Sequence, residues 1–412
     1  MTTGPRQATE GPALSVPRPP SLRHSPLGLA FVASACVAAV SAAAVLFLLA
    51  TRPAPPVTVR GIMASKQDFF NDREVQRLLL AHGVRVEVTA RGSGEVAYEV
   101  LNQKSERYDF AFPSGQPAAD QIKARRQERG LHSVTTRLFS SPIVLATFRE
   151  YAETLVRNDA ATRHGNGSAP SLYYTLETAP FLEFGRQGKT WNDIGLGHEA
   201  GPDGTPVSNG NRVLARTSGV CRTNSGATYL GLVAFVVNGE EPAQTAADAD
   251  RLAARIQPIF AATGMAESEL WRTYVTPEGR SQGPVVVVYE HQFFAYQLDQ
   301  VRRTGRPDGE RVLLYPRQEF LTDPEYISLK PSGDRLGVLL RTDPALRGRM
   351  MELGFRVMDD ADTTGTGTGR LFGFLTANGV PPPAPRTDFT RAELPVLALL
   401  QRMVETVDGC GR

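Results

Sequence analysis

Cysteine and histidine are scarce in this sequence, and their spacing excludes the common metal sites. The 412 residues include three cysteines and six histidines, and none of them forms a Cys-x-x-Cys pair or a His-Glu-x-x-His motif. We therefore expect no metal and no cofactor. Cys36 lies in an apolar run, which leaves Cys221 and Cys410 as candidates for a disulfide, although sequence alone does not place their Cα atoms within bridging distance.

The chain also has almost no net charge. Its 45 Lys and Arg residues balance 43 Asp and Glu residues, so nothing indicates a polyanionic partner, and we expect no nucleic acid. Hydrophobic residues make up 41% of the chain, which is enough for one large or two medium-sized cores. Two lobes are the first expectation.

Recognisable catalytic motifs are missing as well. The sequence has no Gly-x-Ser-x-Gly elbow and no nucleophile with a base at a familiar spacing. The segment "TARGSGEV" at 89–96 follows a predicted strand but lacks the full Gly-x-Gly-x-x-Gly pattern of a nucleotide loop. We therefore favour a binding protein that is not an enzyme; a hydrolase or other transferase is a lesser alternative.

The sequence contains a single long apolar run, the 24 uncharged residues from Leu27 to Ala50, enough to cross a hydrocarbon core of about 30 Å. A cleaved signal peptide is the alternative, but its apolar region is usually about 7–15 residues. We expect a disordered cytoplasmic tail at 1–26, a single-pass anchor in the cell membrane at 27–50, a linker at 51–56 and an extracellular C-terminal part. The flanking arginines favour this orientation, with Arg6, Arg18 and Arg23 before the run and Arg52 and Arg60 after it.

Beyond the linker, strand and helix patterns alternate. Strands are predicted at 57–65, 84–90 and 108–115, with helices at 69–83 and 95–106 between them, which favours a parallel sheet covered by helices. The apolar run 131–148 reads as a strand that leaves this sheet for another. The alternation then resumes, with helices at 226–239, 247–264 and 342–354, a buried parallel-type strand at 283–294, a strand at 310–316 and an amphipathic terminal helix at 390–407.

Small polar residues follow the predicted strands, where open α/β sheets bind their ligands. Helix N-termini carry free N–H groups and partial positive charge, so hydroxyls and arginines there suit a carboxylate or other oxyanion. Each serine may instead simply cap its helix. The candidates are Ser65, Lys66, Ser93 and Ser114 in the first part of the chain and Thr217, Arg222 and Ser225 in the second.

Several motifs carry a resemblance. "RTNSGATYLGLVAFVVNG", "PVVVVYEHQF" and "GDRLGVLLRTDPALRGRMMELGFR" resemble an anchored actinobacterial group of solute-binding-like proteins, and the order of elements is similar to that of type II periplasmic binding proteins. The resemblance covers about residues 57–360 and implies an α/β two-lobe clamshell. Lobe 1 would comprise 57–146 and 311–412, and lobe 2 would comprise 147–310.

The resemblance also implies a function. It would be the capture of a small ligand, such as an oxyanion or carboxylate, between lobes for transport or sensing, with a membrane permease or sensor as partner. Gly226 and Glu290 join the candidates that would face the cleft. Glu290 may instead pair with an arginine. An anchor in place of a lipid-modified cysteine, a glycine-rich insertion before "NRVLART" and a C-terminal extension depart from transport-type relatives. These departures favour a second hypothesis, in which the clamshell binds no ligand and serves as a scaffold for protein–protein interaction in the envelope.

Overall fold

In this computed structural model the chain forms two compact units, Met1–Pro55 and Pro56–Arg412. The described residues are 1, 38–42, 55–64, 66–102, 105–164, 171–260, 264–265, 267–320, 324–358, 367–385 and 389–409. Within them, no helix has both the length and the apolar character that a membrane crossing requires. The tail, anchor and linker predicted at 1–56 lie outside the described residues except for 1, 38–42 and 55–56, and they stay predictions.

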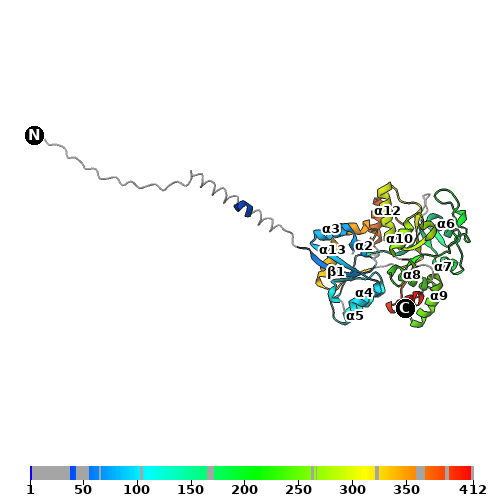
Figure 1. The fold of residues 1–412 in the computed structure, drawn as a ribbon, viewed down its shortest axis with the longest axis horizontal. Coiled ribbons are helices and arrows are strands. Elements are labelled where there is room, and N and C mark those ends of the chain that lie inside the picture. Colours follow the sequence, from blue (N-terminus) through cyan, green and yellow to red (C-terminus); the bar gives the residue numbers. More distant parts are fainter. Residues whose placement is uncertain are drawn as a thin grey trace. The chain divides into compact units, whose positions relative to one another are not determined.

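The first sheet has the order β2-β1-β3-β14-β4. Strands β1 (Val57–Met63), β2 (Val84–Ala90) and β3 (Phe110–Phe112) run parallel, as the alternating pattern predicted, whereas β14 (Glu325–Ser328) is antiparallel to β3 and to β4 (Val134–Arg137). The helices around this sheet are α2 (Gln67–Asn71), α3 (Arg73–Ala81), α4 (Ser93–Asn102), α5 (Gln116–Glu128), α13 (Pro331–Thr342) and α14 (Pro344–Glu352), several of which are seen beside β1 in Figure 1.

Side chains alternate between the two faces of this sheet and fill two separate cores. Phe110 and Phe112 pack in one core with Phe69 and Phe70 of α2, while Ala111 packs in the other. The helix predicted at 69–83 is wrong in one respect, because it is divided into α2 and α3. Asp72 has extended backbone and caps α3 by accepting from Glu74 N and Val75 N, so no single helix runs through it.

The second sheet has the order β11-β6-β12-β8-β7. Its strands are β6 (Ile143–Phe148), β7 (Ala161–Arg163), β8 (Tyr173–Leu176), β11 (Val285–Tyr289) and β12 (Arg311–Pro316). The four-valine strand is fully buried, and its predicted parallel pairing is only partly right. β11 pairs antiparallel with β6, while a single parallel bridge joins Val286 to Arg216. The strand also stops at Tyr289, where Gln292 Oε1 accepts from Tyr289 N and α12 (Glu290–Thr304) begins.

Helices cover the second sheet and share one large core with it. They include α6 (Arg149–Arg157), α7 (Thr178–Arg186), α8 (Asn224–Val237), α9 (Ala246–Phe260), α10 (Glu267–Val275), α11 (Gly279–Gln282) and α12, and from the C-terminal part α15 (Thr368–Ala377) and α16 (Leu397–Asp408). The terminal helix predicted at 390–407 thus starts later, because Pro395 interrupts it. Residues 390–391 instead form β16 (Thr390–Arg391), which pairs with β13 (Gln318–Glu319).

The prediction of a mixed α/β fold with two lobes is confirmed. We call the first sheet with its helices the first half, and the second sheet with its helices, α15 and α16 the second half. The chain passes between the sheets in the run 131–148, with β4 in one sheet and β6 in the other. Strand β12 lies in the second sheet, and the chain rejoins the first sheet at β14. The lobe boundaries predicted at 146 and 310 otherwise stay a prediction.

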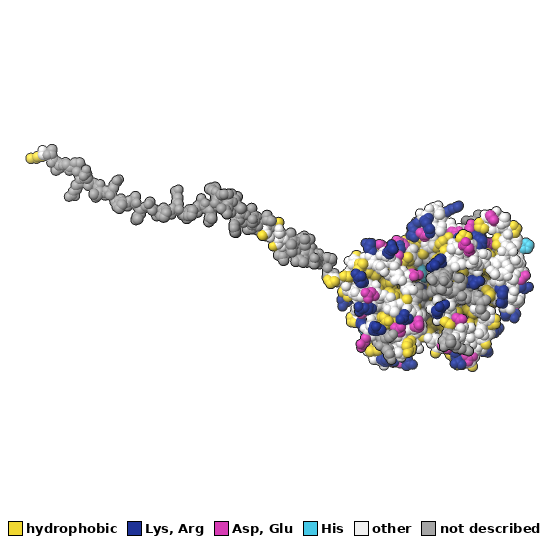
Figure 2. Space-filling model, in the orientation of Figure 1, with side chains coloured by type: hydrophobic (Ala, Val, Ile, Leu, Met, Phe, Trp, Pro, Cys, Tyr) yellow, Lys and Arg dark blue, Asp and Glu magenta, His cyan; other side chains and the backbone are white. Residues whose placement is uncertain are grey.

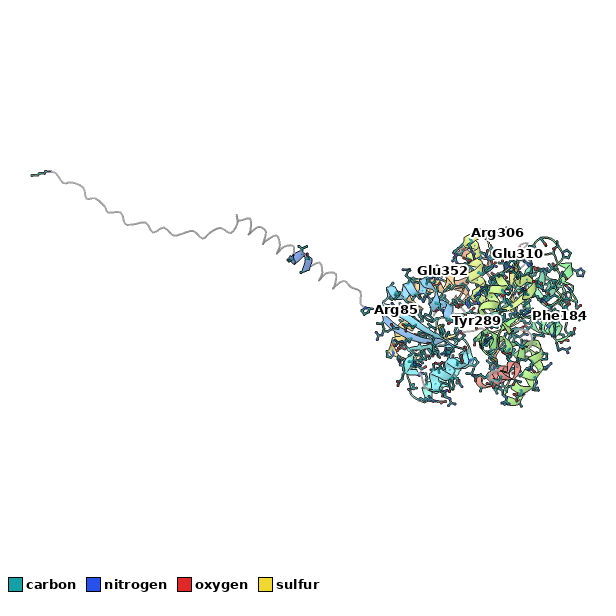
Figure 3. The ribbon with its side chains drawn as sticks, in the orientation of Figure 1. Arg85, Phe184, Tyr289, Arg306, Glu310 and Glu352 are labelled. Atoms are coloured by element: carbon teal, nitrogen blue, oxygen red, sulfur yellow. The ribbon has the colours of Figure 1, made fainter. Side chains whose placement is uncertain are left out.

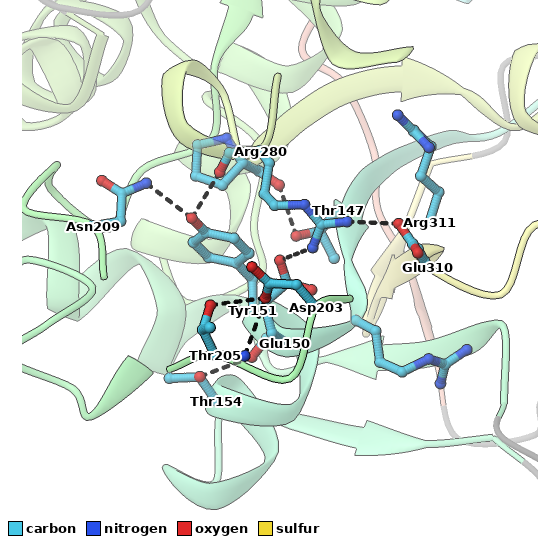
Figure 4. A network of polar contacts seen from close by, with 12 residues as sticks. Thr147, Glu150, Tyr151, Thr154, Asp203, Thr205, Asn209, Arg280, Glu310 and Arg311 are labelled. Atoms are coloured by element: carbon cyan, nitrogen blue, oxygen red, sulfur yellow. Dashed lines mark hydrogen bonds and ion pairs between the residues drawn. The ribbon is translucent and has the colours of Figure 1, made fainter. Parts of the chain in front are cut away.

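The glycine-rich insertion before Arg212 is held to the second half by a polar network (Figure 4). Asn209 Nδ2 donates to Tyr151 Oη at 2.9 Å and to Ser281 O at 3.1 Å, and Tyr151 Oη donates to Arg280 O at 2.7 Å. The Arg280 guanidinium pairs in turn with Glu150 and Glu310. The insertion is therefore anchored through the Tyr151 side chain of α6 and a main-chain carbonyl of α11.

A buried serine–histidine contact joins the connection between the halves to α12. Ser141 Oγ lies 2.9 Å from His291 Nδ1 and accepts from His291 N at 3.1 Å. The imidazole stacks on Phe355, with ring centroids 4.1 Å apart. Burial, and to a lesser degree the positive charge of Lys66, hold the pKa of His291 well below its usual value of 6.5, so the ring is neutral in the folded protein.

This neutral histidine predicts that stability falls in mild acid. Above pH 6.5 the ring is neutral in the folded and unfolded chains, and it adds no pH dependence. As the pH falls below 6.5 only the unfolded chain takes up the proton, so the free energy of unfolding decreases by at most about 1.4 kcal/mol per pH unit until the folded pKa is reached. Urea denaturation from pH 7.5 to about pH 5 should show this slope in the wild type and lose it in His291→Gln.

His198 is exposed and serves as the matched control. The His198→Gln variant should keep the wild-type slope. Equal slopes in the wild type and in His291→Gln would contradict the assignment of a neutral buried ring.

Candidate functional site

Asn224, the first residue of α8, bonds to both halves of the molecule. Its Oδ1 accepts from Ser93 Oγ of the first half at 3.1 Å. Its Nδ2 donates to Tyr289 Oη at 3.1 Å and to Thr228 Oγ1 at 3.2 Å, both in the second half. The carboxamide is 8% exposed, and the bonds it makes satisfy the amide at a buried contact between the halves.

The first half meets Asn224 with two loops, those before α4 and α5. Ser114 N donates to Ser93 Oγ at 3.2 Å, which fixes the hydroxyl that faces Asn224. The next residue is Gly115, where a Cβ atom would lie 2.6 Å from Asn224 Oδ1. The absence of a side chain at Gly115 therefore allows the close approach of the two halves.

The α8 N-terminus is built by hydroxyl groups behind Asn224. Thr223 is the N-cap, because its Oγ1 accepts from Gly226 N at 3.2 Å. Ser218 Oγ lies 2.6 Å from Thr223 Oγ1 and 2.9 Å from Ser225 Oγ. The interpretation that Ser225 caps this helix is therefore wrong, because Thr223 is the cap and Ser225 lies within the first turn.

Lys66 and Tyr289 form a buried cation–π contact next to Asn224. Lys66 is 1% exposed, and its Nζ lies 3.1 Å from the centroid of the Tyr289 ring. Figure 3 shows Tyr289 between Arg85 of the first half and Phe184 of the second. A desolvated contact of this kind contributes on the order of 2 kcal/mol, so the first half is tied to the end of β11 as well as to α8.

Two neighbouring cavities lie beside Asn224. The chamber has a volume of about 190 Å³, and its walls include residues 92–95, Gly115, Pro117 and Ala118 of the first half, residues 220–224 and Ala227 of the second half, and Leu394, Leu397, Leu400, Gln401, Val404 and Glu405 of the C-terminal segment. The groove has a volume of about 400 Å³ and is lined by Ala64, Gln67, Ala90, Arg91, Gly92, Glu95 and residues 221–224. Arg222 and Thr223 line both, so the two cavities are adjacent.

The electrostatics of these cavities are mixed. The exposed Arg222 and the N-terminal turns of α4 and α8 provide positive potential, whereas Glu95 and Glu405 line the chamber with carboxylates. One Glu95 oxygen is engaged, since it accepts from Gly92 N at 2.9 Å. Over the face shown in Figure 2, basic and acidic side chains are interspersed without a field of one sign.

Glu290, a predicted cleft residue, forms a buried ion pair. Its Oε2 accepts from Arg356 Nε and its Oε1 from Arg356 Nη2, both at 2.6 Å. Tyr315 Oη donates to Oε1 at 2.6 Å. The Glu290 side chain is fully buried and that of Arg356 is 7% exposed. Of the two roles considered for Glu290, the structure shows the pairing with an arginine.

Arg356 belongs to β15 (Arg356–Val357), which pairs with β5 (Phe139–Ser140) in the connection between the halves. The neighbouring Phe355 and Val357 pack in a core of the first half. The ion pair therefore joins α12 of the second half to a strand packed on the first half.

The predicted residues are only partly brought together. Ser93, Ser114, Arg222 and Lys66 lie at the contact between the halves or at its cavities, while Ser225 and Gly226 bond within the α8 N-terminus. Thr217 is buried in the short strand β9 (Thr217–Ser218) and lines neither cavity. Ser65 lies outside the described residues. Cys221 takes part in a disulfide, but Cys410 also lies outside them, so their pairing stays a prediction.

The "TNSG" motif places Asn224 among the polar residues before a helix, where a crevice is expected, but the sequence does not single it out as the residue that spans the halves. The sequence likewise does not predict the contacts of Tyr289. Nothing in the sequence pattern pointed to Arg356, which is 66 residues from Glu290.

The fold is similar to several solved binding proteins. They include the sulfate-binding protein SubI from Mycobacterium tuberculosis H37Rv, with 14% identity and a TM-score of 0.43 over 84% of this chain and 96% of that one. Iron-bound HitA from Pseudomonas aeruginosa shows 11% identity and a TM-score of 0.48 over 87% and 100%. The periplasmic binding protein AfuA from Actinobacillus pleuropneumoniae, with fructose-6-phosphate bound, shows 9% identity and a TM-score of 0.46 over 85% and 97%. No family model and no curated protein matches the chain.

The buried ion pair gives a stability prediction. Arg356→Met leaves the Glu290 carboxylate buried without its cation and should lower the free energy of unfolding by about 3–5 kcal/mol. Glu319, whose side chain is 8% exposed, lies 3.8 Å from Arg356 Nη2 and loses the same cation. Glu290→Gln and Glu319→Gln together with Arg356→Met remove all three charges and should recover much of that loss. Urea denaturation at pH 7 measures both variants.

The exposed pair Arg60–Glu87, with side chains 62% and 56% exposed, is the matched control. Arg60→Met should cost less than about 1 kcal/mol. Similar losses in the free energy of unfolding for Arg60→Met and Arg356→Met would show that the buried pair contributes no more to stability than an exposed one.

Proposed function

We propose that this protein binds a small solute between its two halves, as a membrane-anchored extracytoplasmic receptor. The observation that carries the proposal is the pair of adjacent cavities whose walls come from both halves and which share Arg222, Thr223 and Asn224. Cavities between lobes are a usual place for small-molecule sites. Binding there makes the closure of the two halves depend on the solute.

The solute class that best fits is an oxyanion or a carboxylate. Three helices, α4, α5 and α8, begin at the contact between the halves, and their first turns carry N–H groups without a partner in the helix. Arg222 adds an exposed guanidinium that suits either anion. The proteins similar in fold are named for sulfate or were solved with iron or fructose-6-phosphate bound, and their identities of 9–14% leave the ligand of this chain to experiment.

The activity we propose is binding without bond-making. The Ser141–His291 pair could suggest a nucleophile with its base. Ser141 is fully buried, however, and neither residue lines the chamber or the groove. A permease or a sensor in the membrane is the partner that such a receptor would serve.

A ligand-free scaffold for envelope proteins is the second candidate. It is favoured by the hydrogen bond from Ser93 to Asn224, through which the halves hold each other by their own side chains. The receptor and the scaffold predict different results in a ligand screen.

The screen measures melting temperature and calorimetric binding on the full chain, with sulfate, phosphate, acetate, sugars and amino acids as probes. A receptor should bind at least one anion, with stabilisation of about 2.7 kcal/mol at a concentration of 100 Kd. Arg222→Ala should then weaken the binding by about 10-fold or more, because it removes a charge-assisted hydrogen bond.

Arg216 is the matched control, since it lines a different cavity with Asn209, Asn211 and Ser281. Arg216→Ala should leave the affinity for the anion unchanged. If none of the probes binds, the receptor is refuted and the scaffold is favoured.

A further inference from the structure

The C-terminal residues 389–409, which we call the strap, contact both halves. Strand β16 at the start of the strap pairs with β13 directly after the second sheet. Helix α16 then packs along α9 and α8 of the second half and touches α5 of the first. The strap is therefore placed to affect how the halves lie against each other.

The apolar face of the strap is divided between the cores. Leu397 is 9% exposed and packs in a core of the first half with Ile62, Val96 and Ile327. The residues that follow on the same helix pack in the core of the second half; they are Leu400, Met403, Val404 and Val407. One helix thus has its first turn in the first half and the rest in the second.

Polar contacts hold the strap to the second half. Arg402 pairs with Asp250 of α9 through two hydrogen bonds of 2.6 and 2.7 Å. Gln257 Nε2 donates to Thr406 O at 3.4 Å. All of these partners belong to the second half.

The contact with the first half is smaller. Besides Leu397 it involves Gln401, whose Nε2 lies where a side chain on Gly94 would begin, 2.6 Å from an ideal Cβ. Gly94 is in the first turn of α4 and lines the chamber. Among the described residues, the contacts of the strap with the first half thus include Leu397 in a core, Gln401 against Gly94, and the approach of α16 to α5.

The strap is also the apolar wall of the chamber. Leu394, Leu397, Leu400 and Val404 of the strap line it, and the same helix adds the polar Gln401 and Glu405. A solute that fills the chamber would meet these four apolar side chains as well as the polar residues Ser93, Arg222 and Thr223.

We propose that the strap is the moving wall of the chamber. It stays on the second half, parts from the first half at Leu397 and Gln401 to admit a solute, and contacts the apolar part of that solute with its leucines. This inference rests on the proposed function for the solute itself, but the movement of the strap is measurable without a solute. The favoured solute is a carboxylate with a short aliphatic chain.

Hydrogen exchange on the full chain, without added solute, tests the movement. Leu397→Asp places a charge in the contact with the first half. Gly94→Leu adds a side chain that collides with Gln401 and displaces the strap, without removing any buried side chain. Both variants should speed exchange in the first turns of α4 and α5 by about 10-fold or more, while the amides of β1 and β6 keep their protection. Val396→Asp is the matched control, because Val396 is 67% exposed and should leave exchange unchanged.

Two outcomes would overturn the movement. One is unchanged exchange at α4 and α5 in Gly94→Leu. The other is faster exchange in both variants at β1 and β6 as well as at α4 and α5. That result would mean that the substitutions destabilise the whole fold and that the strap does not move by itself.

Calorimetry with acetate, butyrate and hexanoate tests the contact with the solute. Affinity should rise roughly three- to fourfold per methylene group, and Leu394→Asn should abolish that rise. Affinity independent of chain length would refute the apolar contact. Failure of every carboxylate to bind would refute that contact and the aliphatic carboxylate as solute. Binding of sulfate or phosphate would still support the proposed function, and the exchange experiment would still decide the movement.

Discussion

The buried ion pair between Glu290 and Arg356 is the constraint on which the arrangement of the two halves depends. Its charges are removed from water, so they are tolerated only while the bidentate geometry and the Tyr315 hydroxyl satisfy them. Because Glu290 directly follows β11, the pair also fixes Tyr289. Tyr289 in turn carries the Lys66 ammonium on its ring and accepts from Asn224, which accepts from Ser93. A chain of contacts thus runs from the connection between the halves to the candidate site.

This chain of contacts explains why the site lies beside Asn224. The residues that hold the halves together are polar but buried, and they bond mainly to one another. The space left for a solute is therefore next to them, where Arg222 and Thr223 line both the chamber and the groove. Closure of the halves and binding of a solute use the same few residues, so each is expected to influence the other.

Much of the fold could be predicted from the sequence, since its signals are local. Alternating strand and helix patterns placed β1, β2 and β3 and their parallel pairing. Two predicted boundaries differ from the structure because a single side chain determines each. Asp72 caps α3 and so divides the helix predicted at 69–83. Gln292 bonds to Tyr289 N, so α12 begins inside the strand predicted at 283–294. The antiparallel pairing of β11 could not be predicted, because a buried run of valines has no direction.

The candidate site was harder to predict, because its partners are far apart in the sequence. Serines after strands were found by position, yet Ser225 and Gly226 turned out to support the cap, and only contact in space distinguishes them from Ser93. The same holds for the strap. Its amphipathic pattern predicts a helix with one apolar stripe, but not that Leu397 belongs to one core and Leu400 to another. A helix divided in this way buries apolar side chains against both halves, so separation of the halves would expose Leu397.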